Sequence, residues 1–360
     1  MVIRRTAFGI FGFGIGVVVA LVMLELLMRL LPVNLGNLGT RNTALWPMHG
    51  FEAHAPFVYS HGWEMQNVRF GETNNYGQAA PFNFKANVRP VVVVGDSYIE
   101  SRMNDYSETI QAQLARLSGV NDTYGFGLGG LALSDYLALS NQLRSEFAPR
   151  AAVFLITDGD VTESLIPMTG RHYFRINNGV VQTYYDPYIP GLLRYLRPLV
   201  GEIALLRYLQ NNLRFTVQNL RKRLGSKPEG NQKDRTDSEN HHRLAIDFFL
   251  ANLAQELGVS PACTALLIDT EESRLALYEK SDIVQLTTDS ENTRHYLLTR
   301  AKQLGFQIVD LRKVFTTAYQ RSNAQFDRWP VDLHFNGRGH RIAAEQAFAA
   351  LQNSGGDCFR

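Results

Sequence analysis

The sequence lacks the features that mark several common classes of protein. Two cysteines in 360 residues exclude a disulfide-rich scaffold. Lysine and arginine number 36 against 34 aspartates and glutamates, so no basic excess points to a nucleic-acid partner, and we expect none. No repeat is visible, and His241 and His242 have no partners at zinc-ligand spacing. The run "GFGLGG" lacks the pattern of a phosphate-binding loop. We therefore expect no metal and no cofactor.

The two cysteines are Cys263 and Cys358. Cys358 is third from the C-terminus, where chain ends are often poorly ordered. An oxidising compartment would allow the pair to form a disulfide, but a mobile tail seldom holds the geometry that the bond requires. We favour unpaired cysteines and leave the pairing open.

A long apolar run stands near the N-terminus. It follows Arg4 and Arg5, extends over residues 8–31 and is long enough to span a hydrocarbon core as a helix. Basic residues before such a helix predict a cytoplasmic N-terminus. We predict an uncleaved anchor in residues 1–32, held in the inner (cytoplasmic) membrane, with the rest of the chain periplasmic or extracellular.

Two other interpretations of this run are weaker. A cleaved signal peptide would have a shorter apolar region, and no small-x-small cleavage site follows Leu31-Pro32. A buried helix of a soluble protein would not be apolar around most of its circumference. The charged residues Glu25 and Arg29 stand four apart near the outer end, where interfacial water can solvate them.

The chain then changes character twice. Residues 33–87 form a lead-in rich in Gly, Pro and Asn, with a β-hairpin expected within residues 62–78. From residue 88, apolar runs alternate with helical periodicity. The expected strands lie in residues 90–96, 123–130, 150–160, 262–270 and 306–311, and the expected helices in residues 107–119, 133–147, 294–305 and 338–354. This alternation predicts a three-layer α/β/α domain over residues 88–355, with a parallel, flavodoxin-like sheet.

An insert at about residues 164–245 interrupts the alternation. Its amphipathic part, residues 201–224, is expected to be a helix packed over the sheet edge. The alternative is a cap over the active site that touches the membrane surface or an anionic glycan. The polar residues 225–242 are expected to form a mobile loop.

Ser97 ends the stretch "VVVVGDS", and two interpretations compete for it. In one, Ser97 caps the following helix. In the other it is a nucleophile, which requires a base oriented by a third group. Asp332 and His334, in "DLHFNG" near the C-terminus, provide a candidate base and its partner. The carboxyl ends of parallel strands meet at one edge of the sheet, so these residues are expected to converge there.

On these motifs the chain resembles the SGNH (GDSL-type) hydrolase superfamily, particularly bacterial envelope members with an N-terminal membrane helix. The resemblance covers roughly residue 75 to the C-terminal helix. It implies Ser97 as nucleophile, His334 as base and Asp332 as its partner. Aligned on "YGFGLGG", it also implies that Gly127 donates a backbone N–H to the oxyanion.

The chain departs from the family pattern at two places. It has Asp-x-His where Asp-x-x-His is commoner, and Gly159 stands where the family has an oxyanion-binding asparagine. The oxyanion-binding set is therefore Ser97, Gly127 and the Gly159 position. Losing one donor costs on the order of a hundred- to a thousandfold in rate, unless a water molecule or Asn121 substitutes.

The expected function is that of a serine esterase or O-acyltransferase. Its substrate would be a saccharide or other ester, with acetyl groups of cell-envelope or exopolysaccharide as the class that the resemblance implies. A membrane-bound acyl donor would be a partner if the acyl group is transferred. The alternative is a decayed SGNH scaffold serving in glycan binding or envelope assembly. A lipase or thioesterase would need an apolar acyl channel.

Overall fold

The most apolar runs form one parallel sheet in the computed structural model, which describes residues 2–36, 41–42, 49–186, 201–215, 232–279 and 288–360. The strands are β5 (Val91–Gly95), β6 (Thr123–Gly127), β7 (Ala151–Ile156), β10 (Thr264–Ile268) and β11 (Gln307–Asp310). Every residue of β5, β6, β7 and β10 is buried. Strands buried on both faces require helices on both sides of the sheet.

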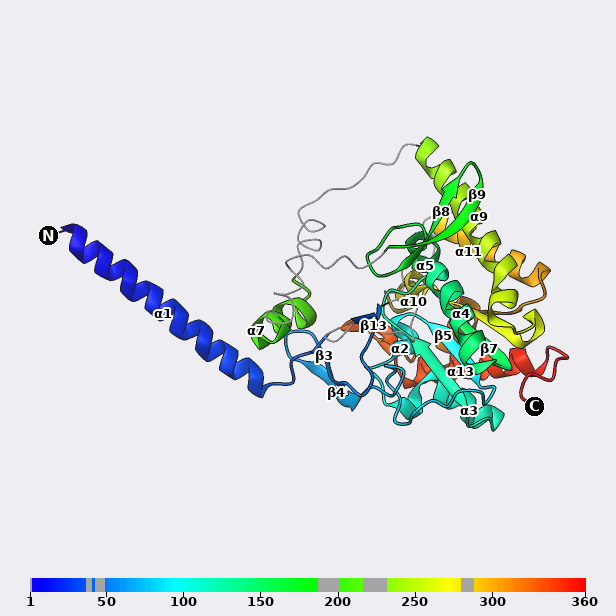
Figure 1. Cartoon of the computed structure of the whole chain (residues 1–360), viewed down its shortest axis with the longest axis horizontal. Coiled ribbons are helices and arrows are strands. Elements are labelled where there is room, and N and C mark those ends of the chain that lie inside the picture. The colour runs from blue at the N-terminus through cyan, green and yellow to red at the C-terminus, as the bar shows by residue number, and fades with distance from the viewer. Residues whose placement is uncertain (1, 37–40, 43–48, 187–200, 216–231, 280–287) are drawn as a thin grey trace. The chain divides into compact units, whose positions relative to one another are not determined.

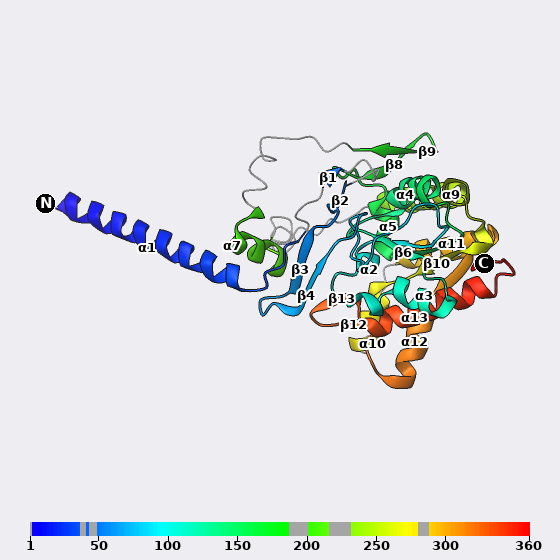
Figure 2. The ribbon, with the colours of Figure 1, turned by 60° about the horizontal axis from the view of Figure 1, so that its bottom comes forward.

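Two layers of helices supply this cover (Figure 2). On one face lie α4 (Leu133–Phe147) and α9 (Gln232–Leu257), which pack against each other, with α11 (Thr288–Gln303) against α9. On the other face lie α3 (Ile110–Ser118) and α13 (Gly337–Gln352), with α12 (Leu311–Ser322) near them. The predicted three-layer α/β/α fold class is confirmed.

The order of the strands locates the functional edge of the sheet. The order is β11-β10-β7-β5-β6. The chain forms β5 and β6 first, and then adds β7, β10 and β11 in turn on the side of β5 that faces away from β6. This is the flavodoxin-like order, in which ligands bind beyond the carboxyl ends of the strands, where the winding reverses. That switch point falls between β5 and β7, and Ser97 follows β5 directly.

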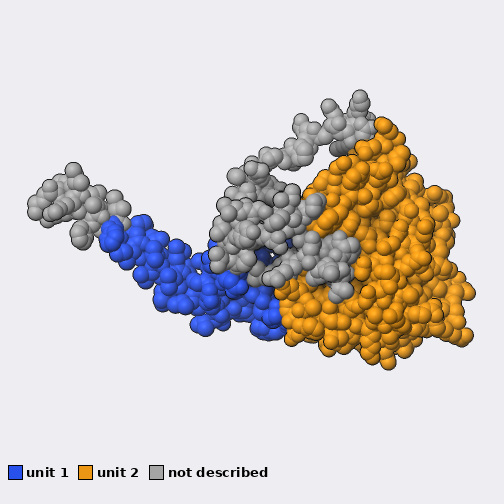
Figure 3. All heavy atoms as spheres, in the orientation of Figure 1, with its two compact units in different colours: residues 1–38, 56–71, 190–227 blue, residues 39–55, 72–189, 228–360 orange. Residues whose placement is uncertain are grey.

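The structure divides into two units, coloured in Figure 3. Unit 2 (residues 39–55, 72–189 and 228–360) contains the sheet. Unit 1 (residues 1–38, 56–71 and 190–227) contains α1 (Val2–Leu30), most of the hairpin of β3 (Pro56–His61) and β4 (Gln66–Glu72), α7 (Ala204–Arg207) and the π-helical turn η2 (Tyr208–Asn212). Residues Phe11–Leu30 are long and apolar enough to cross a membrane, which suits an anchor or a signal sequence.

Two connecting segments differ from their predictions: the lead-in hairpin has other limits, and part of the predicted loop is a helix. The lead-in hairpin spans residues 56–72, because Gly62 and Met65 adopt positive φ and make residues 62–65 its turn. Of residues 225–242, predicted as a loop, 232–242 begin α9. From Ala245 onward, α9 buries an apolar face on the sheet. The polar residues 232–242 extend this helix at its N-terminus, because adding residues to an existing helix is easier than starting a new one. The rest of that loop, residues 225–231, lies outside the described residues.

The insert also holds a hairpin that the sequence analysis missed. Strands β8 (His172–Asn177) and β9 (Val180–Tyr185) are antiparallel and joined by Asn178-Gly179, both with positive φ. An Asn-Gly pair between alternating residues is a strong hairpin signal that could have been used. Of the predicted helix over residues 201–224, α7 and η2 account for residues 204–212, and residues 216–224 lie outside the described residues.

The remaining short elements are β1 (Arg41–Asn42), β2 (His49–Gly50), α2 (Ser97–Glu100), η1 (Tyr106–Glu108), α5 (Asp158–Glu163), η3 (Pro261–Cys263), α10 (Glu271–Glu279), β12 (Asp327–Arg328) and β13 (Asp332–Phe335). Of these, α2, α5, α10 and β13 bear on the site described below.

The cysteines form a disulfide, so the favoured prediction of free thiols is wrong. Cys358 is buried rather than in a mobile tail, because the chain after α13 turns back and Phe359 packs against Phe348, with 5.4 Å between ring centroids. This brings the Cα atoms of the two cysteines to 5.2 Å, across 95 residues of sequence. The bond fastens the C-terminus to the start of β10.

Replacing both Cys263 and Cys358 with serine is expected to lower the free energy of unfolding by about 4 kcal/mol, because closing so long a loop restricts the unfolded chain. Urea unfolding of the full chain in detergent measures this. Reductant should lower the midpoint of the wild type to that of the variant and leave the variant unchanged. A wild-type midpoint insensitive to reductant under unfolding conditions would contradict the stabilising role.

Candidate active site

Ser97 lies at the turn from β5 into α2. Asp96 caps this helix, its Oδ1 accepting a hydrogen bond from Tyr98 N at 2.9 Å. The turn requires Gly95, since a Cβ there would come within 2.5 Å of Ile99 Cγ1. The capping interpretation of Ser97 is therefore wrong: Asp96 performs that role, and the Ser97 hydroxyl is left for another partner.

That partner is His334, which lies in β13. The Ser97 Oγ is 2.7 Å from His334 Nε2, and His334 Nδ1 is 2.6 Å from Asp332 Oδ1. A carboxylate can only accept, so Nδ1 carries the proton and Nε2 accepts from Ser97. Residues two apart in a strand share a face, which explains how Asp-x-His aligns the two side chains. Ser97, His334 and Asp332 thus form one chain of hydrogen bonds, although Ser97 and His334 are 237 residues apart in the sequence.

A second set of contacts ties the two backbone segments together. Tyr98, next to the serine, places its hydroxyl 3.0 Å from the carbonyl of Leu333, next to the histidine. Arg274 of α10 donates to that same carbonyl at 2.9 Å and to the Tyr98 hydroxyl at 2.7 Å. Figures 1 and 2 show α2 beside β13, and the elements are in contact. These residues hold Ser97 and His334 at their mutual distance.

Arg274 is fully buried and its charge is compensated. It pairs with Asp269, which follows β10, and with Asp327 of β12 at 3.1 Å. Sequence reasoning missed Arg274, because a single arginine in "EESRLALYE" carries no signal of burial. Removing one partner of a buried pair is strongly destabilising, so this cluster stabilises the fold around the site as well.

The charges around His334 favour its protonated form. Burial alone would lower the pKa of His334, but the hydrogen bond and charge of Asp332, together with the charges of Asp96 and Glu271, raise that pKa above its ordinary value. Burial raises the pKa of Asp96 to about 7, although the hydrogen bond from Tyr98 N opposes this. An imidazolium formed at His334 is therefore stabilised.

This electrostatic setting predicts the pH dependence of any reaction that uses His334 as a base. The base must be neutral, so activity falls as the pH drops through the raised pKa of His334. Replacing Glu271 with glutamine removes one negative charge and keeps an acceptor for Tyr98. The acidic limb of kcat/KM against pH should then move to lower pH, whereas Glu345→Gln, on the exposed face of α13, should leave it unchanged. A limb that does not move in E271Q would contradict this assignment.

The predicted oxyanion donor Gly127 is not available. It ends β6, and its N–H donates to Gln78 Oε1 at 2.9 Å. The residue beside the nucleophile is Gly129, where a Cβ would lie 3.6 Å from Ser97 Cβ. Its own N–H donates to Glu100 Oε2 at 2.7 Å. Next comes Gly130, with φ of +76° and an N–H that has no hydrogen-bond partner among the described residues. Within the part of the chain that the structure describes, the N–H of Gly127 is therefore occupied, and that of Gly130 is not.

The Gly159 position lies in α5, after β7. A Cβ there would meet Glu163 Oε1 at 3.6 Å, an ordinary contact, so the backbone leaves room for a side chain. Asn121 does not substitute for the missing amide, because it precedes β6 and lies at the opposite edge of the sheet from Ser97. Among the residues that the structure describes, the Ser97 N–H also has no partner.

The acidic residues beside Gly159 carry less charge than the sequence suggests. Burial raises the pKa of Asp158 to about 7. Burial also raises the pKa of Asp160, whose carboxyl is bonded to Thr157 and to the Tyr136 hydroxyl at 2.9 Å. Asp160 is thus part of the capping of α5, and both groups place less negative charge near an oxyanion than two ordinary aspartates would.

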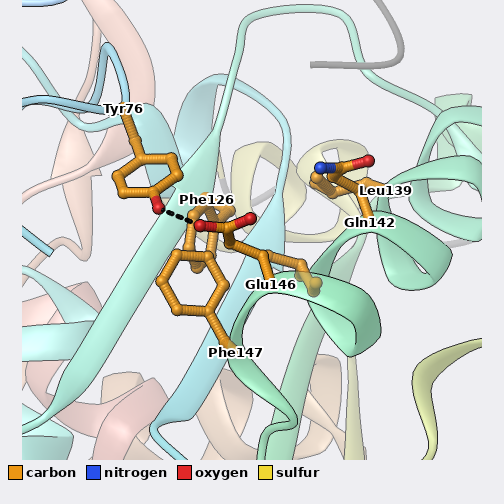
Figure 4. Close-up of a pocket in the computed structure, with 7 residues that line it drawn as sticks. Tyr76, Phe126, Leu139, Gln142, Glu146 and Phe147 are labelled. Carbon is orange, nitrogen blue, oxygen red and sulfur yellow. Dashed lines mark hydrogen bonds between the residues drawn. The ribbon is translucent and has the colours of Figure 1, made fainter. Parts of the chain in front are cut away.

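A second serine–histidine pair lies close in sequence. Ser101 Oγ is 2.9 Å from His340 Nε2, but both residues are buried and no substrate could reach them. Burial lowers the pKa of His340 to about 3, so it stays neutral. A hollow on another part of unit 2, lined by Tyr76, Phe126, Phe147 and residues of α4, contains none of the site residues; there the Tyr76 hydroxyl donates to Glu146 at 2.7 Å (Figure 4).

Comparison with known proteins adds little to this geometry. The sequence matches no family model and no curated protein. Among solved structures it is similar to LAE5, an alpha/beta hydrolase enzyme from the metagenome of Lake Arreo, Spain. The two are 13% identical with a TM-score of 0.40, over 76% of this chain and 99% of that one.

Proposed function

We propose that the protein is a membrane-anchored serine enzyme that cleaves or transfers ester-linked acyl groups. The observation that carries this proposal is the chain of hydrogen bonds from Ser97 through His334 to Asp332, at 2.7 and 2.6 Å. Nucleophile, base and orienting carboxylate are the parts that acyl transfer requires, and they are recognised by geometry rather than by sequence order. The position at the switch point of the sheet supports the same conclusion.

In the proposed reaction, Ser97 Oγ attacks the ester carbonyl and His334 Nε2 takes its proton. The N–H groups of Ser97 and Gly130 would hold the oxyanion, with Gly130 replacing Gly127 in this role. When the C–O bond breaks, His334 returns the proton to the leaving alcohol. The acyl group then passes from Ser97 to water in an esterase, or to a sugar hydroxyl in an O-acyltransferase. Asp332 orients the imidazole throughout.

The location and substrate class rest on other features. The apolar helix Phe11–Leu30 suits an inner-membrane anchor, and a buried disulfide suits the oxidising side of that membrane. A saccharide of the envelope bearing acetyl esters is the substrate that this location and the family resemblance favour. A membrane-bound acyl donor would supply the acyl group for transfer.

A fluorophosphonate probe tests the proposal directly. The purified full chain should be labelled stoichiometrically at Ser97, because the probe reacts with a serine activated by a neighbouring base. S97A should not be labelled, and S101A should be labelled like the wild type, since Ser101 is enclosed. Absence of labelling in the wild type would favour the second candidate function, a scaffold without activity that binds glycan, for which the glycine at position 159 is the motivating observation.

Restoring the family's asparagine should raise activity. In Gly159→Asn, the added amide would donate to the oxyanion, and a Cβ at this position makes only ordinary contacts, with Glu163 and Thr157. Since one oxyanion donor is worth about a hundred- to a thousandfold, kcat for an acetyl ester should rise by at least tenfold. Gly159→Asp, of similar size but without donors, is the control and should not raise kcat. An unchanged kcat in G159N would mean that position 159 does not face the oxyanion.

A further inference from the structure

The segment formed by α7 and η2 in unit 1 carries an apolar stripe on its outer face. Ile203, Leu206 and Leu209 recur at every third position, and each is 37% exposed. On the opposite face, Ala204 and Asn212 are buried. Ile203 is the N-cap residue of α7, Leu206 lies within α7 and Leu209 lies in the π-helical turn that follows. Three exposed aliphatic side chains on one short segment with a buried opposite side are typical of a segment that lies at a membrane surface.

The segment is fastened to the apolar helix α1 at one charged residue. The carboxylate of Glu25 accepts hydrogen bonds from Ala204 N at 3.1 Å and Leu205 N at 2.9 Å, and so caps the first turn of α7. Arg29 pairs with Glu25 at 2.7 Å and donates to the carbonyl of Glu202 at 3.2 Å. Figures 1 and 2 both show α7 beside the C-terminal end of α1.

A polar contact at the other end of the segment fixes its orientation. Asn212 donates to Ser60 Oγ of β3 at 2.9 Å and accepts from Asn34 N at 3.0 Å. The Tyr208 hydroxyl donates to the carbonyl of Trp63, in the turn after β3, at 2.9 Å. With its inner face occupied by these contacts, the segment presents its aliphatic face outward.

The depth of the attachment identifies what covers that face. Glu25 stands five residues before Leu30, the end of the apolar span, which at 1.5 Å per residue is about 7 Å inside it. Amphipathic helices bury their apolar face about 5–10 Å into the boundary between headgroups and acyl chains. Trp63 of unit 1 is also exposed, and tryptophan is enriched at membrane–water interfaces.

We propose that Ile203, Leu206 and Leu209 lie in the outer interface of the membrane, in contact with the lipid chains next to the headgroups. The inference rests on the proposed anchor, because α1 must span the membrane for α7 to lie at this depth. The protein then has two contacts with the bilayer, one across it and one along its surface, and Glu25 joins them. This contact fixes the rotation of unit 1 about the axis of α1.

Tryptophan quenching by brominated lipid tests this proposal in the full chain. The three tryptophans, Trp46, Trp63 and Trp329, are replaced by phenylalanine, and one is introduced by Leu206→Trp. In vesicles whose lipids carry bromine near the headgroup end of the acyl chains, the tryptophan of Leu206→Trp should lose most of its emission. Bromine at the chain ends should quench it less. The matched control is Leu117→Trp, on exposed α3 of unit 2, which should keep its emission in both lipids.

A third variant separates this inference from the anchor on which it rests. Val18→Trp, in the middle of the apolar span, should be quenched most by bromine at the chain ends. Quenching at position 18 without quenching at position 206 would overturn the interfacial contact and leave the anchor intact. Adding Glu25→Ala to L206W should reduce quenching, because α7 loses its attachment. Undiminished quenching would show that Glu25 does not hold the segment. If the tryptophan of Val18→Trp is not quenched by bromine at the chain ends, α1 does not span the membrane, and the interfacial contact is overturned as well.

Discussion

Replacing Ser97 with alanine is expected to lower kcat for an ester substrate by about a millionfold, the loss typical of a serine nucleophile that acts together with its histidine. The Ser97 hydroxyl is the group that forms the acyl-enzyme, and Ser101, the other serine paired with a histidine in this region, is enclosed. Initial rates with an activated acetyl ester measure the effect. The histidine variant H334A should lose a comparable amount, and the double variant little more, because the two residues act as one unit.

Ser101→Ala is the matched control for this experiment. It removes a hydroxyl group from a serine that lies four residues after Ser97 and that also hydrogen-bonds a histidine. It should lower stability by about 1–3 kcal/mol, because the buried hydroxyl hydrogen-bonds both the carbonyl of Tyr98 and His340. It should leave kcat within a few-fold of the wild type. If S97A kept its rate of ester cleavage and of glycan acylation, the mechanism would be wrong. If S101A lost as much as S97A, the assignment of the nucleophile would fail.

The second large effect is expected for Asp332→Asn, with a loss of about 10⁴-fold in kcat. The carboxylate accepts from His334 Nδ1 at 2.6 Å and so leaves Nε2 free to take the serine proton. An amide can donate to Nδ1 instead, which puts the imidazole proton on Nε2, the wrong nitrogen for a base. Loss of the negative charge also removes a cause that raises the pKa of His334, so the acidic limb of the pH profile should move to lower pH.

The matched control is Asp122→Asn, at the opposite edge of the sheet, where the carboxylate accepts from the Tyr124 hydroxyl at 2.9 Å. This variant should leave kcat unchanged. In D332N, KM should change far less than kcat, because Asp332 acts through His334 and does not contact substrate. A loss of less than tenfold in D332N would mean that another group orients the imidazole.

Much of the fold could be predicted from the sequence because the strongest patterns are the buried ones. Runs such as Val91–Val94, short and wholly β-branched, are typical of strands covered on both faces, and helix α4 matches its predicted limits residue for residue. The polar start of α9 could not be predicted, since it is helical only by continuing an apolar helix. The disulfide was missed for a related reason. The packing of Phe359 on Phe348, which orders the tail, is a tertiary contact.

The site divides in the same way. Ser97, His334 and Asp332 could be found because each stands in a short motif after a strand or within one. Gly127 was chosen from several glycines in one run, and only the hydrogen bond from its N–H to Gln78 shows that it is occupied. Arg274 could not be found at all, because its role depends on two segments that the fold brings together from far apart in the chain.

The contact of Tyr98 and Arg274 with Leu333 has a consequence for engineering the protein. Hydrogen bonds among α2, α10 and β13 hold the nucleophile and the base at their mutual distance. None of the residues that make these bonds belongs to the hairpin of β8 and β9. The hairpin is therefore not part of the contacts that hold the serine and the histidine together. Grafting a different hairpin at residues 172–185 should therefore retain the distance between Ser97 Oγ and His334 Nε2.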